Sequence, residues 1–143
     1  MSQSTPAQAA GTSIQGYIQR IKSLPSLQEL TAEKLVEVTR SLGKRFAERK
    51  VPASQIYKFH EHIIRLATNV SAGRVEPLEA KILSYHLSYA AARINNFDQR
   101  NAMKELASFF DAALEKIGTA GDITRLRQIS EAVVAYHKFF GGR

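Results

Sequence analysis

The stretch that decides the fold is LRQISEAVVAYHKFFGGR, residues 126–143. Its large apolar side chains recur at intervals of three and four residues, which is the spacing of one face of an α-helix. Terminal residues usually fray unless they are packed. This helix is therefore expected to dock, with Phe139 and Lys138 on its more polar side. The residues expected to anchor it in the core are Leu126, Ile129, Val133, Tyr136 and Phe140.

The same periodicity continues through the chain, and no stretch alternates with period two. The sequence therefore predicts an all-α protein, a compact bundle of five to six helices. Thr31 is expected to cap the second helix, Asp122 the last one, and Gly141 to end the last one in a left-handed conformation. The predicted helices cover about residues 12–23, 31–49, 54–71, 77–95 and 97–117, followed by the last helix after the GTAGD turn.

The first residues differ in composition from the rest of the 143-residue chain. Residues 1–11, MSQSTPAQAAG, contain no large apolar side chain and cannot offset the entropy lost on ordering, so they are predicted to form a disordered tail. Residues 12–143 are predicted to form a single helical-bundle domain, because a chain of this length can bury one sizeable core.

Charge and composition bear on partners and location. Twenty Lys and Arg residues against thirteen Asp and Glu residues give a net charge of +7. This excess favours a polyanion such as nucleic acid, with a merely solubilising charge as the alternative. The chain contains no cysteine, long apolar run or leader pattern. We therefore expect a cytoplasmic protein that does not bind membranes.

The pattern of polar residues does not favour catalysis. The four histidines are His60, His62, His86 and His137, and the closest two lie on different faces of one helix. No phosphate-binding glycine loop or nucleophile elbow occurs. The sequence therefore predicts a protein that is not an enzyme, with no metal and no cofactor.

A basic stripe runs along the third predicted helix. Lys58, His62, Arg65 and Asn69 recur at steps of four, three and four residues, opposite the apolar face. Such a line can follow a phosphate backbone without reading sequence. The alternative is a solvated face held by a Glu61–Arg65 pair.

Basic residues also occur on two other predicted helices. On the second helix, Arg45 and Arg49 lie in residues 45–50, which are expected to be less neutralised than the rest of that helix. Arg93 is expected either to pair with Glu131 or Asp98 or to contact RNA.

The fourth predicted helix, residues 77–95, is apolar on nearly all sides. That pattern is typical of a helix at the centre of a bundle, and it places His86 in the core.

Three segments together resemble the small subunit of type III-A CRISPR effector complexes, the Csm small subunit. They are SQIYKFHEHI (54–63), LSYAAARI (87–94) and EAVVAYHKFFGG (131–142), and their order and spacing carry the resemblance over residues 53–142.

The resemblance implies a non-catalytic helical subunit of a ribonucleoprotein complex in antiviral defence. Such subunits stack in several copies along the complex, beside the other Csm subunits, and line a groove for guide and target RNA. The resemblance supports RNA contacts at Lys58, Arg93 and Lys138, whereas Arg45, Arg49 and Arg65 rest on helix geometry and charge.

The sequence leaves two other functions open. The Pro52 turn followed by SQIYKFHEHIIRL (54–66) also fits a sequence-specific helix-turn-helix DNA-binding regulator. A purely structural protein–protein adaptor is the third possibility.

Overall fold

A computed structural model describes residues 13–143; the predicted disordered tail, residues 1–11, lies outside this range. The described chain contains six α-helices, two 3₁₀ helices and no strand, so the prediction of an all-α bundle is confirmed. The α-helices are α2 (Ile14–Lys22), α3 (Ala32–Glu48), α4 (Ala53–Ser71), α5 (Leu83–Ala92), α6 (Phe97–Leu114) and α7 (Ala120–Phe139). The 3₁₀ helices are η1 (Leu27–Glu29) and η2 (Pro77–Ile82).

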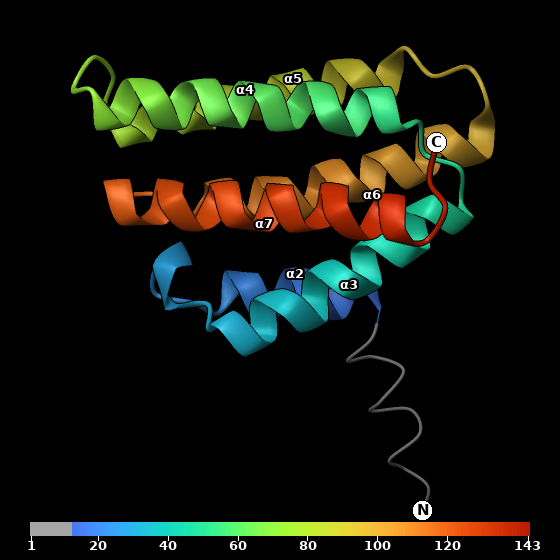
Figure 1. Cartoon of the computed structure of the whole chain (residues 1–143), viewed down its shortest axis with the longest axis horizontal. Coiled ribbons are helices and arrows are strands. Elements are labelled where there is room, and N and C mark those ends of the chain that lie inside the picture. Colours follow the sequence, from blue (N-terminus) through green and yellow to red (C-terminus); the bar gives the residue numbers. More distant parts are fainter. Residues whose placement is uncertain (1–12) are drawn as a thin grey trace, which may run out of the picture.

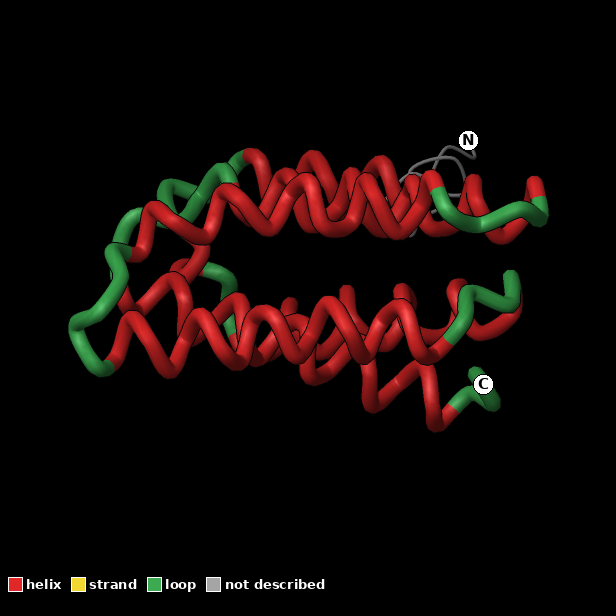
Figure 2. The backbone as a smooth tube through the Cα atoms, turned by 90° about the horizontal axis from the view of Figure 1, so that it is seen from above, coloured by secondary structure: helices red, strands yellow, loops and turns green. Residues whose placement is uncertain are grey.

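The α-helices lie in two layers (Figure 1). In one layer α7 packs between α3 and α4, and in the other α6 packs between α2 and α5. Seen from above, the two layers form separate rows (Figure 2). The central positions therefore belong to α6 and α7, and α4 and α5 form one edge of the bundle.

One hydrophobic cluster occupies the space between the layers and involves all six helices. Phe109 and Phe110 of α6 lie at its centre, with ring centroids 5.4 Å apart and ring planes nearly perpendicular. Phe59 of α4 meets Phe110 edge-on at 4.9 Å. These edge-to-face contacts are the preferred geometry of aromatic pairs, and they fix α4 against α6.

Residues 77–95, predicted as one central helix, form two shorter helical elements at the edge of the bundle. Residues Pro77–Ile82 form η2, and α5 begins only at Leu83. Because α5 lies at the edge of its layer, it buries one side only, while Tyr85 and Tyr89 are 60% and 65% exposed. The prediction of a central helix is wrong, since the apolar residues on its outer side face solvent.

The end of α7 packs through a different residue from those predicted. Leu126, Ile129 and Val133 are fully buried, as expected. Tyr136 and Phe140 are only half-buried, so their prediction as core anchors is wrong. Arg40 of α3 covers both rings, with its guanidinium carbon 5.8 Å and 5.2 Å from their centroids.

His137 takes the buried position instead, at 2% exposure. Its Nε2 donates a hydrogen bond to the Val51 carbonyl at 2.9 Å, which places the proton on Nε2. Gly142 passes directly over this ring, and a Cβ there would lie 2.1 Å from a ring carbon. The last carbonyl, of Arg143, accepts from the Ala53 amide at 2.9 Å, so the chain end is tied to the start of α4.

A second close approach lies between α3 and α7. A Cβ at Gly43 would lie 2.4 Å from the Tyr136 Cβ and 2.7 Å from the His137 amide nitrogen. Only glycine allows the two helices to come this near.

The start of α7 is held by a reciprocal cap. Thr119 is the N-cap residue, and Asp122, predicted to cap this helix from its side chain, does so at N3 by forming a capping box with Thr119. Asp122 is 1% exposed, and it accepts hydrogen bonds from the amides of Gln28, Gly118 and Thr119. Burial alone would raise the pKa of Asp122, but these donors outweigh it and lower the pKa.

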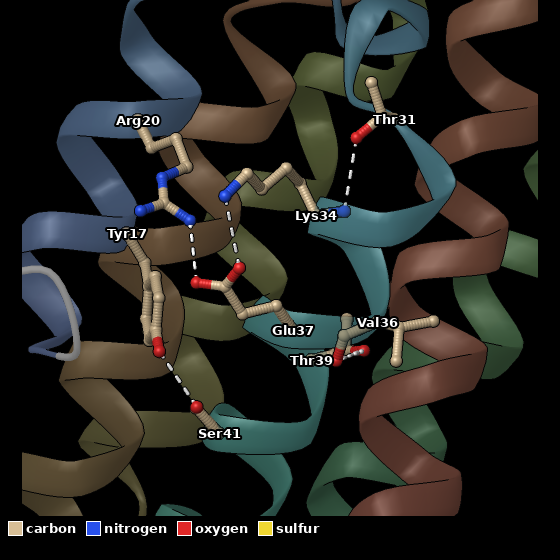
Figure 3. Close-up of polar contacts among 8 residues, drawn as sticks. All are labelled: Tyr17, Arg20, Thr31, Lys34, Val36, Glu37, Thr39 and Ser41. Carbon is tan, nitrogen blue, oxygen red and sulfur yellow. Dashed lines mark hydrogen bonds and ion pairs between the residues drawn. The ribbon is translucent and has the colours of Figure 1, made fainter.

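Helices α2 and α3 are joined by polar contacts, partly buried and partly at the surface (Figure 3). The Tyr17 hydroxyl donates to Ser41 Oγ at 2.8 Å. Glu37 binds Arg20 at 3.0 Å and Lys34 at 3.3 Å. Hydrogen bonds from these two cations lower the pKa of Glu37. Thr31 caps α3 as predicted, its Oγ1 accepting from the Lys34 amide at 3.2 Å.

None of the helices described within residues 13–143 is long and apolar enough to cross a membrane.

Candidate nucleic-acid interface

Helix α4 separates apolar and basic residues as the sequence predicts. Ile56, Phe59 and Ile63 are buried on the side of α4 that packs against α7, and Phe59 also meets Phe110 of α6. Lys58 and Arg65, seven residues apart, are both exposed on the opposite side. The core contacts therefore fix the helix while leaving its cations in solvent.

Neither cation is neutralised locally. Among the described residues, Lys58 and Arg65 form no salt bridge, and the alternative Glu61–Arg65 pair does not form. A cation without an acidic partner keeps its full attraction for a phosphate group.

A pocket of about 320 Å³ lies between α4 and α5. It brings together Lys58 from the first helix and Arg93 from the end of the second. Arg93 is exposed and lies over the Tyr89 ring, 5.5 Å from its centroid. The predicted pairing of Arg93 with Glu131 or Asp98 is wrong, because Arg93 forms no salt bridge among the described residues.

Two histidines line the same pocket. His62 of α4 and His86 of α5 stack with their centroids 4.2 Å apart. His86 is half-buried in this stack and is not the core residue that the sequence predicted. Burial lowers the pKa of His62, and the neighbouring His86, Arg65 and Lys58 lower it further.

Lys138 borders α4 from the other side. It is exposed on α7 and lines a small cavity of about 100 Å³ together with Tyr57 of α4. Phe139 beside it is 70% exposed, as expected from the sequence. Arg93, Lys58, Arg65 and Lys138 are hereafter called the α4 cations, because they lie on α4 or beside it.

A family comparison decides the assignment of this helical bundle. A model of the Csm2 Type III-A family matches residues 29–143, which is most of the chain. The chain belongs to the Csm2 family. This family comprises the small subunits of type III-A CRISPR Csm complexes, which are in general non-catalytic structural components associated with the other Csm subunits and crRNA. Comparisons with curated proteins and with solved structures each found no match.

In this Csm2 subunit the remaining two candidate residues are ion-paired. Arg45 of α3 and Arg49, the C-cap residue of α3, both bind Glu105 of α6, at 2.9 Å and 3.0 Å. Burial alone would raise the pKa of Glu105, but the two arginines outweigh it and lower the pKa. The prediction that residues 45–50 are little neutralised is wrong for these arginines, because Glu105 is distant in sequence.

Within residues 13–143 of the Csm2 subunit, no three His, Asp or Glu side chains gather in a way that could hold a metal ion. The His62–His86 pair is the part of the site that sequence reasoning missed. Its two rings come from helices and lie 24 residues apart along the chain, and no local spacing signals the contact.

Lowering the pH from about 7 to 5.5 is expected to destabilise the Csm2 subunit. Burial lowers the pKa of His60, His62 and His137 from the ordinary 6.5. The unfolded chain therefore takes up protons first as the pH falls through 6.5, and the free energy of unfolding decreases. Carboxyl groups titrate below this range.

Circular dichroism melts across this pH series measure the effect. His137→Gln, with one fewer titrating group, should show a smaller decrease in melting temperature between the two pH values. A melting temperature that rises on acidification would contradict the prediction.

Proposed function

We propose that this Csm2 subunit binds guide and target RNA through their phosphate backbones, without sequence specificity. The observation that carries the proposal is the group of α4 cations, all exposed and none paired with a carboxylate in residues 13–143. Such cations supply affinity by releasing counterions from the nucleic acid, and they read no base.

Arg45 and Arg49 enter the proposal as a weaker contact. Two guanidinium groups share the single carboxylate of Glu105, so the cluster retains one net positive charge. Its attraction for phosphate is therefore smaller than that of two free arginines, since part of the field is cancelled nearby.

The α4 cations also suit a subunit that repeats along an RNA. In the proposed arrangement, residues 12–143 act as a single helical-bundle domain, and several copies stack along the Csm complex in antiviral defence. Each copy presents its α4 cations to the same polyanion, so binding is distributed along the strand.

Replacing Lys58 and Arg65 together by alanine is expected to weaken binding of unrelated single-stranded RNA sequences about equally. Both side chains lie opposite the buried face of α4, so the fold should be unchanged. The slope of log affinity against log salt should fall by about 0.7 for each phosphate that the variant no longer binds. Fluorescence anisotropy titrations at several salt concentrations measure both quantities.

The matched control is Arg20→Ala with Lys34→Ala, which removes the same charge from α2 and α3. These two cations are already paired with Glu37, so the control should retain more affinity than the α4 variant. Equal decreases in affinity for both variants would show that RNA binding depends on the net charge of the protein and not on the position of the α4 cations. Weaker binding of one sequence only, or preference for a DNA operator, would support the helix-turn-helix regulator instead.

A further inference from the structure

The pocket between α4 and α5 has the size of a site for one small ligand. Its volume is about 320 Å³, at the lower end of the range of about 300 to 1,000 Å³ for ligand pockets. Buried Phe59 and Leu87 form its apolar floor, and Ala90 contributes a small side chain to its wall. The floor of the pocket is therefore apolar.

Aromatic rings surround this floor. The His62 and His86 rings, which both line the pocket, are stacked with an interplanar angle of 22°. Tyr89 also lines the pocket and keeps 65% of its surface exposed. Flat rings that remain accessible are the surfaces on which single-stranded nucleic acids stack their bases.

Polar groups without partners complete the lining. Among the described residues, the side chains of Gln55, His62 and His86 make no hydrogen bond. An amide and two imidazoles supply both donors and acceptors, as the polar edge of a nucleobase requires.

The charged side chains that line the pocket indicate which class of molecule it binds. Lys58 and Arg93 both line the pocket, and neither has an acidic partner in residues 13–143. Two free cations beside an apolar, ring-lined pocket complement a group that is flat and aromatic at one end and anionic at the other. A nucleotide has this form, whereas an apolar side chain of a protein partner brings no anion for the cations.

We propose that this pocket takes one unstacked base of single-stranded RNA, while Lys58 and Arg93 hold the phosphates on either side. The inference rests on the proposed function and extends it, because a base contact is added to backbone contacts. Gln55 and the histidines meet the polar edge of the base, and Tyr89 provides for stacking the ring face that Arg93 does not cover. The occupant is any unpaired nucleotide, since stacking tolerates all four bases.

The test compares two oligomers of equal phosphate number, a single-stranded RNA and its abasic counterpart, with the full chain as the protein. The wild-type chain should bind the base-bearing oligomer about 5- to 150-fold more tightly, the range for stacking one base on an aromatic side chain. Ala90→Phe fills the pocket without changing charge and should lower affinity for the base-bearing oligomer to about that of the abasic one.

Two further variants keep the test decisive. Tyr89→Ala removes a stacking face without adding volume and should reduce the same preference, even if Ala90→Phe does not fold. Phe97→Ala is the matched control, because Phe97 is 66% exposed, close to the value for Tyr89, and does not line the pocket. It should retain the full preference for the base-bearing oligomer.

The outcomes separate this inference from the proposed function. Equal, salt-dependent binding of both oligomers by the wild-type chain overturns the base pocket and leaves phosphate binding standing. Binding of neither oligomer overturns both. A preference that survives in both pocket variants overturns the pocket as the site and places the stacked bases elsewhere. Equal binding combined with failure of Ala90→Phe to assemble with the other Csm subunits shows that a protein side chain occupies the pocket.

Discussion

A chain that ends at Ala132 is expected to lose its cooperative unfolding transition. The truncation removes Val133 and His137, which are 0% and 2% exposed, together with the hydrogen bond from His137 to Val51. Emptying buried sites of this size costs about 2 to 5 kcal/mol each. A domain has only about 5 to 15 kcal/mol in total, so emptying two such sites removes a large part of it.

Circular dichroism melts of the truncated and intact chains measure this effect. Phe139→Ala serves as the control, because it removes a large side chain from the same helix end but one that is 70% exposed. Its free energy of unfolding should stay within about 0.5 kcal/mol of the wild-type value. If the truncated chain melts like the intact one, residues 133–143 do not serve the core, and their apolar side chains form a partner surface.

Gly43→Leu is expected to lower the free energy of unfolding by about 3 kcal/mol, at the upper end of the range for overpacked sites. A Cβ at this position meets Tyr136 Cβ at 2.4 Å and backbone atoms of α7 at 2.7 Å and 2.8 Å. Backbone atoms cannot rotate away, so α3 and α7 must separate. The gain in helix propensity from glycine to leucine, about 0.8 kcal/mol, is too small to compensate.

The matched control is Gly118→Leu, in the turn between α6 and α7. The nearest atom to a Cβ there is 3.8 Å away, which is ordinary contact, and the residue is exposed. Urea unfolding of both variants gives the comparison. Equal midpoints for the two variants would show that the α3–α7 contact adjusts without cost.

The helices and several of their ends could be predicted from sequence because their causes are local. The three-four spacing identifies each amphipathic helix, and Thr31 caps α3 as its side chain and position suggest. The place of each helix in the bundle is not a local property. The apolar outer side of α5 resembles a core face in sequence, yet α6 takes the central position and leaves Tyr85 and Tyr89 in solvent.

The candidate site likewise has features that follow from local sequence and features that depend on contacts between distant residues. The basic side of α4 follows from helical geometry, so the sequence correctly predicts Lys58 and Arg65 opposite the core. The neutralisation of Arg45 and Arg49 depends on Glu105, about 60 residues away, and no spacing rule signals it. The pocket needs α4 and α5 side by side, so its lining by Lys58, His62 and Arg93 could be recognised only in the folded chain.

The position of α5 at the edge of its layer also determines how easily this helix opens locally. The helix buries only Leu83, Leu87 and Ala91, and Ile82 at its start provides no side-chain cap. Segments with so few buried contacts open locally at a small fraction of the global unfolding free energy, and their amide hydrogens exchange with solvent early. We therefore expect the amide hydrogens of α5 to exchange with solvent before those of the central helices α6 and α7.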